Sequence, residues 1–483
     1  MSKILSRRNF LKSSVAAGAA ATAFRGAPAI LSAAAKGDKL RVAFIGVGGI
    51  NDRHISDTRS HGDIGAAYCD VDNKRWDNFD KSIKALEDEG KGDLAKFWKE
   101  AKGYQDYREM FDKDSDKFDA VMIGTPDHSH YPATVMALNH GKAVFTQKPL
   151  THTVWEARQL SDAVDKYKVA TQMGNHGHAN DGNRLIAAYV QGGYLGDVKE
   201  IHCFTNRPVW PQGMERPTGE NEIPEGLDWE SWIGPAPMRP FVNGVYHDFK
   251  WRGILDFGGG ALADMACHTM DSIFMSLDPG YPTHVEAINV DTLTDDAFPK
   301  GSTLKWTFGP KGDRPGFEVY WYDGTDNEDN GKRHPRLVEL TNGQNFANSG
   351  NIYVGSERTL LVQGDYGDSS RIIPEDAHRE LAQKLKDETD SPAPPAVYEK
   401  SIGHHTEWRE AAIGNKPYDY PGSNFKYAGP FTETIQLGNV CLHLPGESLA
   451  WDGPNLKFSN NDKANELITK AYREGWDIKL DKA

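Results

Sequence analysis

A short apolar segment followed by closely spaced glycines, at residues 40–51, constrains the fold more than any other part of the chain. Residues 40–45 (LRVAFI) are apolar enough to form a buried strand, and residues 46–51 (GVGGIN) follow directly. Glycines between a strand and a helix let backbone N–H groups approach a pyrophosphate at the helix N-terminus. We therefore expect this segment to begin a dinucleotide-binding domain, although Asn51 stands where the usual pattern has its third glycine.

The next strand is expected at residues 63–70, and it ends in Asp70, 24 residues after the first glycine of the turn. A carboxylate at this place binds the ribose hydroxyls of NAD and repels the 2′-phosphate of NADP. Asp72 competes for this role, and the nearby cations Lys74 and Arg75 leave NADP open as the cofactor.

Helix-like and strand-like segments alternate through the rest of this region. Residues 73–101 and 131–140 have helical periodicity, whereas residues 118–124 form an apolar run that is typical of a buried strand. Such alternation predicts a parallel, doubly wound sheet. We expect this Rossmann domain to occupy residues 39–168.

A lysine–proline pair, Lys148-Pro149, follows the last strand of this domain. Proline disfavours the helical conformation for the residue before it, so Lys148 should stay extended at the carboxyl end of the strand. Ligands of open α/β sheets bind at that edge, where an ammonium group can meet a substrate oxygen.

A second, α+β domain with a largely antiparallel open sheet is expected at residues 169–395. Its strands are predicted at residues 283–292, 302–309, 315–322 and 352–363. A long loop at residues 206–258 contains Trp210, Trp229, Trp232, Tyr246 and Trp251. Loops of this length inside a domain are usually functional, and this one is expected to shape either a sugar pocket or an oligomer interface.

A helical segment after Gly258-Gly259-Gly260 contains Asp264 and His268. At a spacing of four residues the carboxylate and the imidazole lie on one helical face, where the acid can influence the orientation and charge of the ring.

These motifs together resemble the oxidoreductase family named for glucose–fructose oxidoreductase, inositol dehydrogenase and a rhizopine-catabolism protein. The resemblance rests on the glycine turn, on Thr125-Pro126 with His130, on Gln147-Lys148-Pro149 and on Asp264-x-x-x-His268, and it covers nearly the whole chain after the N-terminal segment. Most members have Glu where this chain has Gln147, so no carboxylate role carries over to that position.

The resemblance implies a role for each motif residue. His268 would be the general base, Asp264 its partner or a substrate ligand, and Lys148 the ammonium that polarises the reacting oxygen. Cofactor contacts are expected from Gly46, Gly48, Gly49, Ile50, Asp70, Thr125, Pro126, Asp127, His130, Gln147 and Lys148. Substrate contacts are expected from Lys148, Asn175, His176, Trp251, Asp264 and His268. The helical residues 396–483 would pack back on the cofactor domain.

Residues 1–35 resemble an export signal. Arg7-Arg8 precedes an Ala-rich apolar run at residues 15–23 that is too short to span a membrane, and small-residue cleavage sites follow. We expect a periplasmic or otherwise exported protein. Twin-arginine export carries folded proteins, and little free NAD exists outside the cytoplasm, so the cofactor is expected to be NAD that is bound before export and does not dissociate.

Composition excludes several other classes of protein. A formal net charge of −14 and an isoelectric point near 5.7 disfavour nucleic acid and anionic membranes as partners. Four widely spaced cysteines suggest neither a disulfide framework nor a thiolate zinc site. The expected partners are a small carbohydrate and further copies of the chain, as a dimer or tetramer.

The sequence thus predicts an NAD-dependent oxidoreductase that transfers a hydride between a ring hydroxyl of a sugar or glycoside, with C3 as a candidate, and a tightly held nicotinamide. The alternative is an NAD-dependent glycosidase that uses transient oxidation and elimination. Less favoured alternatives are a hydrolase and a non-catalytic sugar-binding protein. The hydrolase would hold a metal with the histidine pairs His128/His130 and His176/His178, together with Asp264 and His268. We expect no bound metal.

Overall fold

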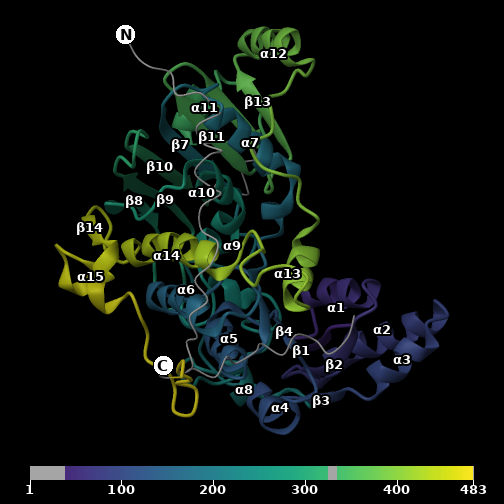
Figure 1. Ribbon diagram of the computed structural model, residues 1–483. Coiled ribbons are helices and arrows are strands. Elements are labelled where there is room, and N and C mark those ends of the chain that lie inside the picture. The colour runs from purple at the N-terminus through teal and green to yellow at the C-terminus, as the bar shows by residue number, and fades with distance from the viewer. Residues whose placement is uncertain (1–38, 325–333, 482–483) are drawn as a thin grey trace, which may run out of the picture. The chain divides into compact units, whose positions relative to one another are not determined.

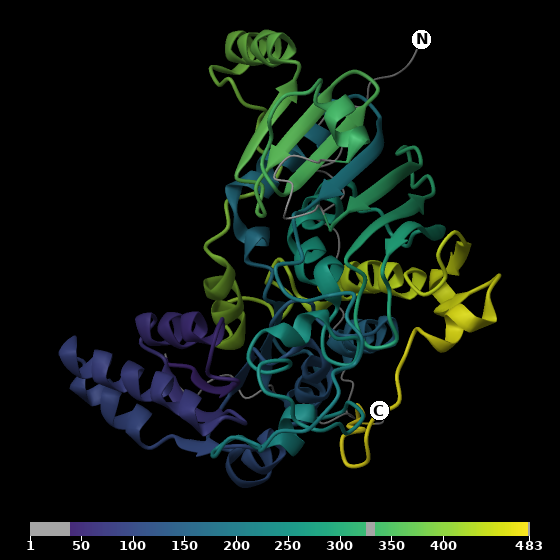
Figure 2. The ribbon, with the colours of Figure 1, turned by 180° about the vertical axis from the view of Figure 1, so that it is seen from behind.

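The computed structural model describes residues 39–324 and 334–481, which form two β-sheets and the helices around them (Figures 1 and 2). The expected export signal lies outside these residues. Among the helices that the structure describes, none is long and apolar enough to cross a membrane.

The first sheet has six parallel strands in the order β3-β2-β1-β4-β5-β6. The strands are β1 (Arg41–Ile45), β2 (Ile64–Cys69), β3 (Lys102–Tyr104), β4 (Ala120–Ile123), β5 (Ala143–Thr146) and β6 (Thr171–Met173). The helices and short 3-10 turns between them are α1 (Asn51–Ser60), η1 (Asn73–Trp76), α2 (Asp77–Asp88), α3 (Gly92–Lys99), α4 (Tyr107–Asp114), η2 (Asp127–Ser129), α5 (His130–Asn139) and α6 (Val154–Tyr167). This is the predicted doubly wound Rossmann architecture.

Strand β1 shows why these apolar runs form central strands. Val42 and Phe44 pack into one hydrophobic cluster, and Ala43 and Ile45 pack into another. Alternate side chains of a strand point to opposite faces, so a strand that is covered on both faces must be apolar throughout.

Strand β6 corrects the expected boundary between the domains. The sequence pattern assigned this strand to the second domain, but Thr171–Met173 pairs in parallel with β5 and completes the first sheet. A three-residue strand has no local feature that decides which sheet it joins, because pairing partners are set by tertiary structure.

The second sheet has nine strands in the order β13-β12-β11-β7-β10-β9-β8-β14-β15. They are β7 (Val198–Phe204), β8 (His284–Asp291), β9 (Gly301–Phe308), β10 (Phe317–Tyr322), β11 (Gly350–Gly355), β12 (Thr359–Gln363), β13 (Ser369–Ile373), β14 (Ser448–Asp452) and β15 (Lys457–Phe458). Only the β7–β10 pair is parallel among the pairs described, so the sheet is largely antiparallel, as expected. The segment expected at 352–363 is a hairpin of β11 and β12, because residues 356–358 form a turn.

The remaining helices link and cover the sheets. They are η3 (His176–Ala179), α7 (Asp181–Gln191), α8 (Trp229–Ile233), η4 (Lys250–Gly253), α9 (Gly260–Thr269), α10 (Asp271–Leu277), α11 (Pro335–Leu340), α12 (Glu375–Thr389), α13 (His404–Ala412), α14 (Phe425–Cys441), η5 (Gly453–Asn455) and α15 (Asp462–Glu466). Helix α14 packs against both α6 of the first domain and α9 of the second. Arg409 of α13 forms a bidentate ion pair with buried Asp63 of the first domain, with N–O distances of 2.6 and 2.9 Å.

The aromatic residues of loop 206–258 are mostly a core of the loop itself. Trp229 and Trp232 stack with their ring centroids 4.6 Å apart, and Phe241, Tyr246 and Phe257 pack around them. All of these side chains are buried. The loop is therefore a small packed unit with an aromatic core of its own.

Candidate active site

A cavity of about 580 Å³ lies between the carboxyl ends of the first-sheet strands, helix α9 and loop 206–258. This volume is in the range of pockets for small ligands and cofactors. Its lining includes most of the predicted site residues, namely Gly46, Gly48, Gly49, Ile50, Asp70, Thr125, Pro126, Asp127, Gln147, Lys148, His176, Trp251, Asp264 and His268.

Two predicted contact residues, His130 and Asn175, lie behind the cavity wall. The ring nitrogens of His130 are 2.7 Å from the Pro149 carbonyl oxygen and 2.9 Å from that of Thr125, so the ring braces the loops on either side. Asn175 is fully buried and accepts a hydrogen bond of 2.6 Å from the Ser423 hydroxyl. His130 thus supports the lining residue Thr125 from behind the wall.

The glycine turn between β1 and α1 has the shape that a dinucleotide requires. Gly46 has φ +79°, and a side chain there would lie 2.9 Å from the Gly124 carbonyl oxygen. Gly49 has φ +59° and open space where a side chain would be. The hydroxyl oxygen of Thr125, at the end of β4, is buried without a hydrogen-bond partner among the described residues. A bound pyrophosphate would accept hydrogen bonds at such a turn, so these residues fit a dinucleotide.

Asp70 rather than Asp72 faces the cavity at the end of β2. Its carboxylate accepts hydrogen bonds from the backbone N–H groups of Val47, at 2.9 Å, and of Asp72, at 3.0 Å. Burial raises the pKa of Asp70. The Asp72 carboxylate instead caps η1 by accepting from the Lys74 N–H. Of the two acids, only Asp70 is therefore placed to contact a ligand in this cavity.

Lys148 and Asp264 form an ion pair inside the cavity. The Lys148 ammonium donates to the Asp264 carboxylate and to its backbone carbonyl, both at 2.8 Å, and Arg252 Nε lies 3.3 Å from the same carboxylate. Burial opposes ionisation of Asp264, but Lys148 and Arg252 outweigh it and hold the pKa of Asp264 far below its ordinary value. Asp264 is therefore a fixed anion that orients the ammonium.

His268 lies one turn further along α9 and also faces the cavity. Its ring packs edge-on against Tyr366, with the centroids 4.9 Å apart, and its Nδ1 has no hydrogen-bond partner among the described residues. Burial, with a smaller contribution from Lys148, lowers the pKa of His268 to about 3. The imidazole is therefore neutral near pH 7, and a neutral ring can accept a proton.

Asp127 adds a second unusual carboxyl group to the cavity. Burial raises its pKa to about 7, although Arg252 and Lys148 act in the opposite direction. Its Oδ2 accepts a hydrogen bond of 3.0 Å from the N–H of Gly259, just before α9.

Several lining residues have no sequence motif. Arg207, His247, Asp248, Arg252, Asp365, Tyr366 and Trp476 enter the cavity from loop 206–258, from the β12–β13 turn and from the C-terminal tail. Arg252 could have been predicted as a cavity residue from its neighbour Trp251, which was an expected substrate contact. The other residues lie far from the motifs in the sequence, so no local pattern indicates that they line the cavity.

The histidines considered for a metal centre do not converge. The ring nitrogens of His128 face the carbonyl oxygens of Phe257, at 3.3 Å, and Trp232, at 3.1 Å, while His178 bonds to Asp271 at 3.0 Å. The rings of His176 and His54 stack with centroids 5.6 Å apart. Each of these histidines therefore contacts a different partner, and the rings do not point toward one common site.

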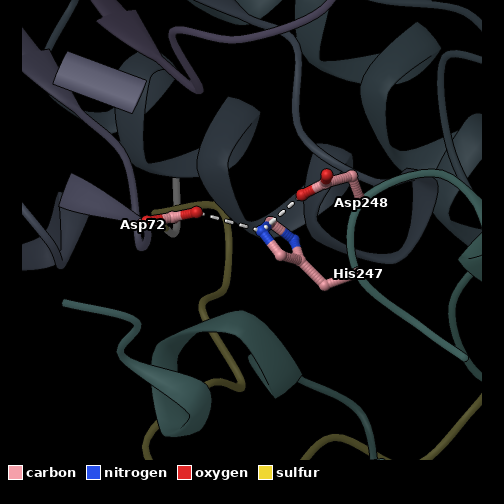
Figure 3. Close-up of side chains that lie close together, drawn as sticks. All are labelled: Asp72, His247 and Asp248. Carbon is pink, nitrogen blue, oxygen red and sulfur yellow. Dashed lines mark hydrogen bonds and ion pairs between the residues drawn. The ribbon is translucent and has the colours of Figure 1, made fainter. Parts of the chain in front are cut away.

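Within residues 39–324 and 334–481, one group of three side chains has metal-type ligand atoms close together: Asp72, His247 and Asp248 (Figure 3). His247 Nε2 lies 3.3 Å from the Asp72 carboxylate and 2.7 Å from that of Asp248. The guanidinium of Arg75 is 2.7 Å from Asp248. The positive charge beside these carboxylates is therefore supplied by Arg75.

Comparison with known proteins agrees with this architecture. Residues 40–175 match the model of an oxidoreductase family with an NAD-binding Rossmann fold, residues 185–311 match the C-terminal α/β domain of the same family, and residues 5–24 match a twin-arginine translocation signal. The last match confirms the predicted signal for export to the periplasm.

Individual relatives are distant. An uncharacterised oxidoreductase of Streptococcus pneumoniae is 30% identical over 98 residues, which cover 20% of this chain and 26% of that protein. An inositol 2-dehydrogenase of Pseudomonas fluorescens is 27% identical over 174 residues, covering 35% and 47% of the two chains. A glycosyl hydrolase family 109 protein of Shewanella pealeana is 28% identical over 165 residues, which is 34% of each chain. The matches thus span between about a quarter and a half of these curated relatives.

Solved structures share the fold over most of the chain. The WlbA dehydrogenase of Chromobacterium violaceum, solved with NADH and UDP-GlcNAcA, superposes with a TM-score of 0.56 at 17% identity, covering 86% of this chain and 97% of that one. The two matching family domains, in the expected order and joined to the two sheets described above, identify the chain as a member of the glucose–fructose oxidoreductase, inositol dehydrogenase and MocA (Gfo/Idh/MocA) oxidoreductase family.

Proposed function

We propose that the protein is an NAD-dependent oxidoreductase that transfers a hydride between a ring hydroxyl of a sugar or glycoside, with C3 as a candidate, and a tightly held nicotinamide. One observation carries the proposal. The oriented ammonium of Lys148 and the neutral imidazole of His268 line the same cavity as the glycine turn between β1 and α1. A proton acceptor, a cation and a nucleotide cradle are what the oxidation of an alcohol requires.

The residues divide the work of this reaction between them. His268 accepts the proton of the substrate hydroxyl, and Lys148 stabilises the negative charge that develops on the same oxygen. Asp264 keeps the ammonium in place through its 2.8 Å contact. NAD, when bound, supplies the hydride acceptor. Trp251 and His176 line the cavity and are proposed substrate contacts.

Retention of the cofactor is supported by the way loop 206–258 is tied to the first domain. The N–H of Asn73 donates to the Gly226 carbonyl at 3.0 Å, and the N–H of Asp228 donates to the Val71 carbonyl at 2.8 Å. The side-chain amide of Gln105 donates to the carbonyls of both Val71 and Gly226. The loop is thus bonded to the chain just after β2, beside the place where Asp70 meets the ribose. A nucleotide that is enclosed in this way can survive export inside the folded protein.

Asp127 favours a second candidate, an NAD-dependent glycosidase. A carboxyl group with a pKa of about 7 in this cavity is protonated often enough to act as an acid toward a leaving group. In that reaction transient oxidation of the sugar acidifies the neighbouring C–H and permits elimination of the aglycone. The partial similarity to a glycosyl hydrolase family 109 protein is consistent with it.

Nucleotide release and product analysis test these proposals together. We expect protein purified without added cofactor to release near-stoichiometric NAD(H) on denaturation, with little NADP(H). Incubation with a glycoside and a second, keto sugar that re-oxidises the bound NADH should then yield an oxidised glycoside if the dehydrogenase proposal is correct. Free sugar without net oxidation, formed without that second sugar, is expected if the glycosidase proposal is correct. A protein that is empty and also fails to bind added NAD or NADP would overturn both.

A further inference from the structure

A small cluster of charges lies at the ribose end of the cavity, where an arginine that could bind NADP meets three acids. The aliphatic part of Arg75 packs on the glycine turn, because a side chain added at Gly48 would lie 3.3 Å from Arg75 Cδ. Arg75, Asp70 and Asp248 all line the cavity. An arginine shortly after β2 is the usual device for accepting the 2′-phosphate of NADP. The other local cation, Lys74, is exposed and is absent from the lining.

In this structure Asp248 binds the guanidinium. The Nη2 atom of Arg75 lies 2.7 Å from the Asp248 carboxylate, and its Nε atom lies 4.0 Å from the Asp72 carboxylate. His247 connects the two acids, since its Nε2 lies between them (Figure 3). Asp248 belongs to loop 206–258, so this contact comes from outside the Rossmann domain.

The ion pair between Arg75 and Asp248 contributes little to stability. The side chain of Arg75 is 36% exposed and that of Asp248 is 57% exposed. Solvent screens pairs this exposed, so they contribute little to folding. Because Arg75 and Asp248 pair in the lining of the proposed nucleotide site, we relate their contact to cofactor binding and not to stability.

We propose that Asp248 is a specificity-determining residue that excludes NADP by occupying Arg75. A 2′-phosphate arriving here meets the carboxylates of Asp70 and Asp248 against one guanidinium, and that guanidinium already has a partner. NAD carries a 2′-hydroxyl in the same place and meets no such repulsion. This inference rests on the proposed function, because it assigns the cofactor preference of the same site.

The substitution Asp248→Asn tests the proposal directly. It removes the charge and keeps the size of the side chain, so Arg75 becomes free to bind a phosphate. We expect the ratio of NADP(H) to NAD(H) released from the denatured variant to rise at least about tenfold over wild type, because the freed guanidinium can donate charge-assisted hydrogen bonds to the 2′-phosphate. Calorimetric titration of protein that purifies empty should show the same change in the ratio of the Kd values for NAD and NADP.

Three further variants make the result specific. Adding Arg75→Ala to Asp248→Asn should return the ratio to the wild-type value, because the phosphate partner is gone. Asp248→Ser gives a second route to the same test if the Asn variant folds poorly. Glu230→Gln is the matched control, since Glu230 lies on the same loop, pairs with Arg473 at 3.2 Å and is absent from the cavity lining.

The possible outcomes distinguish failure of this inference from failure of the proposed oxidoreductase function. Wild-type protein that retains NAD, with a ratio that stays within about twofold in both Asp248 variants, would overturn the role of Asp248 and leave the oxidoreductase proposal intact. Wild-type protein that binds neither nucleotide would overturn the proposed function itself.

Discussion

Lys148 owes its position to the two residues beside it. Pro149 disfavours a helical conformation for the lysine. Gln147 is buried, and its side-chain nitrogen lies 2.6 Å from Nε2 of His54. Burial lowers the pKa of His54 to about 3, so the ring is neutral. A neutral amide suits a neutral imidazole, whereas the glutamate usual in the family would bury a charge at this position.

The paired roles of Lys148 and His268 predict a distinctive loss of activity. Lys148→Met and His268→Gln should each lower kcat for sugar oxidation by about 10²–10⁴-fold, because each removes a positioned group that acts on the reacting oxygen. Neither change touches the glycine turn, so both variants should still release NAD(H) on denaturation. Steady-state kinetics and nucleotide assays on the same preparations would measure this.

A surface lysine provides the control for this experiment. Lys96 pairs with Asp93 on an exposed face of α3, and Lys96→Met should leave kcat unchanged. Retention of a third or more of the wild-type kcat by Lys148→Met would contradict the role of its ammonium.

The first helix begins at the residue where the glycine pattern departs from the usual one. Asn51 is fully buried, and its side-chain amide donates hydrogen bonds to the carbonyls of Ile45 and Gly46. A side chain at Gly124 would clash with Asn51 Oδ1. A third glycine usually permits the close approach of helix and strand. Here the small residue that permits it is Gly124, which directly follows β4.

Loop 206–258 is bonded to the chain just after Asp70, and Gln105 is its side-chain anchor there. Gln105→Ala removes two hydrogen bonds, of 2.9 Å to Val71 and 2.8 Å to Gly226. We expect the dissociation rate of NAD to rise several-fold while the chemistry is unchanged, since a looser loop opens more often. Exchange of bound NAD for labelled NAD would measure this rate.

Gln383 is a suitable control for the anchor, because it is an exposed glutamine on α12 whose side-chain amide donates to the Asp387 carboxylate. Gln383→Ala should leave the exchange rate as in wild type. An unchanged rate in Gln105→Ala would mean that the backbone bonds alone hold the loop.

Buried neutral histidines occur in both domains, and they determine how the whole molecule responds to acid. Burial lowers the pKa of His54, His128 and His404 to about 3, and those of His130 and His202 to about 4. Below about pH 6.5 the unfolded chain therefore binds more protons than the folded one. Stability from these rings is complete above that pH and is lost as the pH falls. Burial raises the pKa of the carboxyl groups of Asp127 and Glu433 to about 7, which opposes the trend in part.

We predict that the free energy of unfolding falls steeply between pH 6.5 and pH 4.5, by up to about 1.4 kcal/mol per pH unit for each buried ring. His54→Gln should give a shallower slope, because one titrating ring is gone. His284→Gln, at an exposed position, should leave the slope as in wild type. Denaturant unfolding at a series of pH values would measure the three slopes, and equal slopes for His54→Gln and wild type would refute the explanation.

Local signals were sufficient for the elements that carry the motifs. Apolar runs bounded by glycines determined β1, β4 and β5, since a strand that is buried on both faces must be apolar throughout and needs a turn at its end. The Lys-Pro pair and the spacing of four residues between Asp264 and His268 identified side chains that do line one cavity. The sequence by itself therefore determined the sheet class, the family and the core of the candidate site.

Tertiary structure decided everything that depends on which distant segments meet. Strand β6 joined the first sheet, His130 and Asn175 lie behind the cavity wall, and the tryptophans of loop 206–258 packed on one another. Asp248 reached Arg75 across more than 170 positions of the chain. Such contacts leave no local pattern, because the sequence around a loop aspartate is the same whether its side chain faces solvent or an arginine. A nucleotide-binding turn can be predicted from adjacent residues in the sequence. The proposed preference of this site for NAD over NADP depends instead on a distant loop segment that only the tertiary structure brings to it.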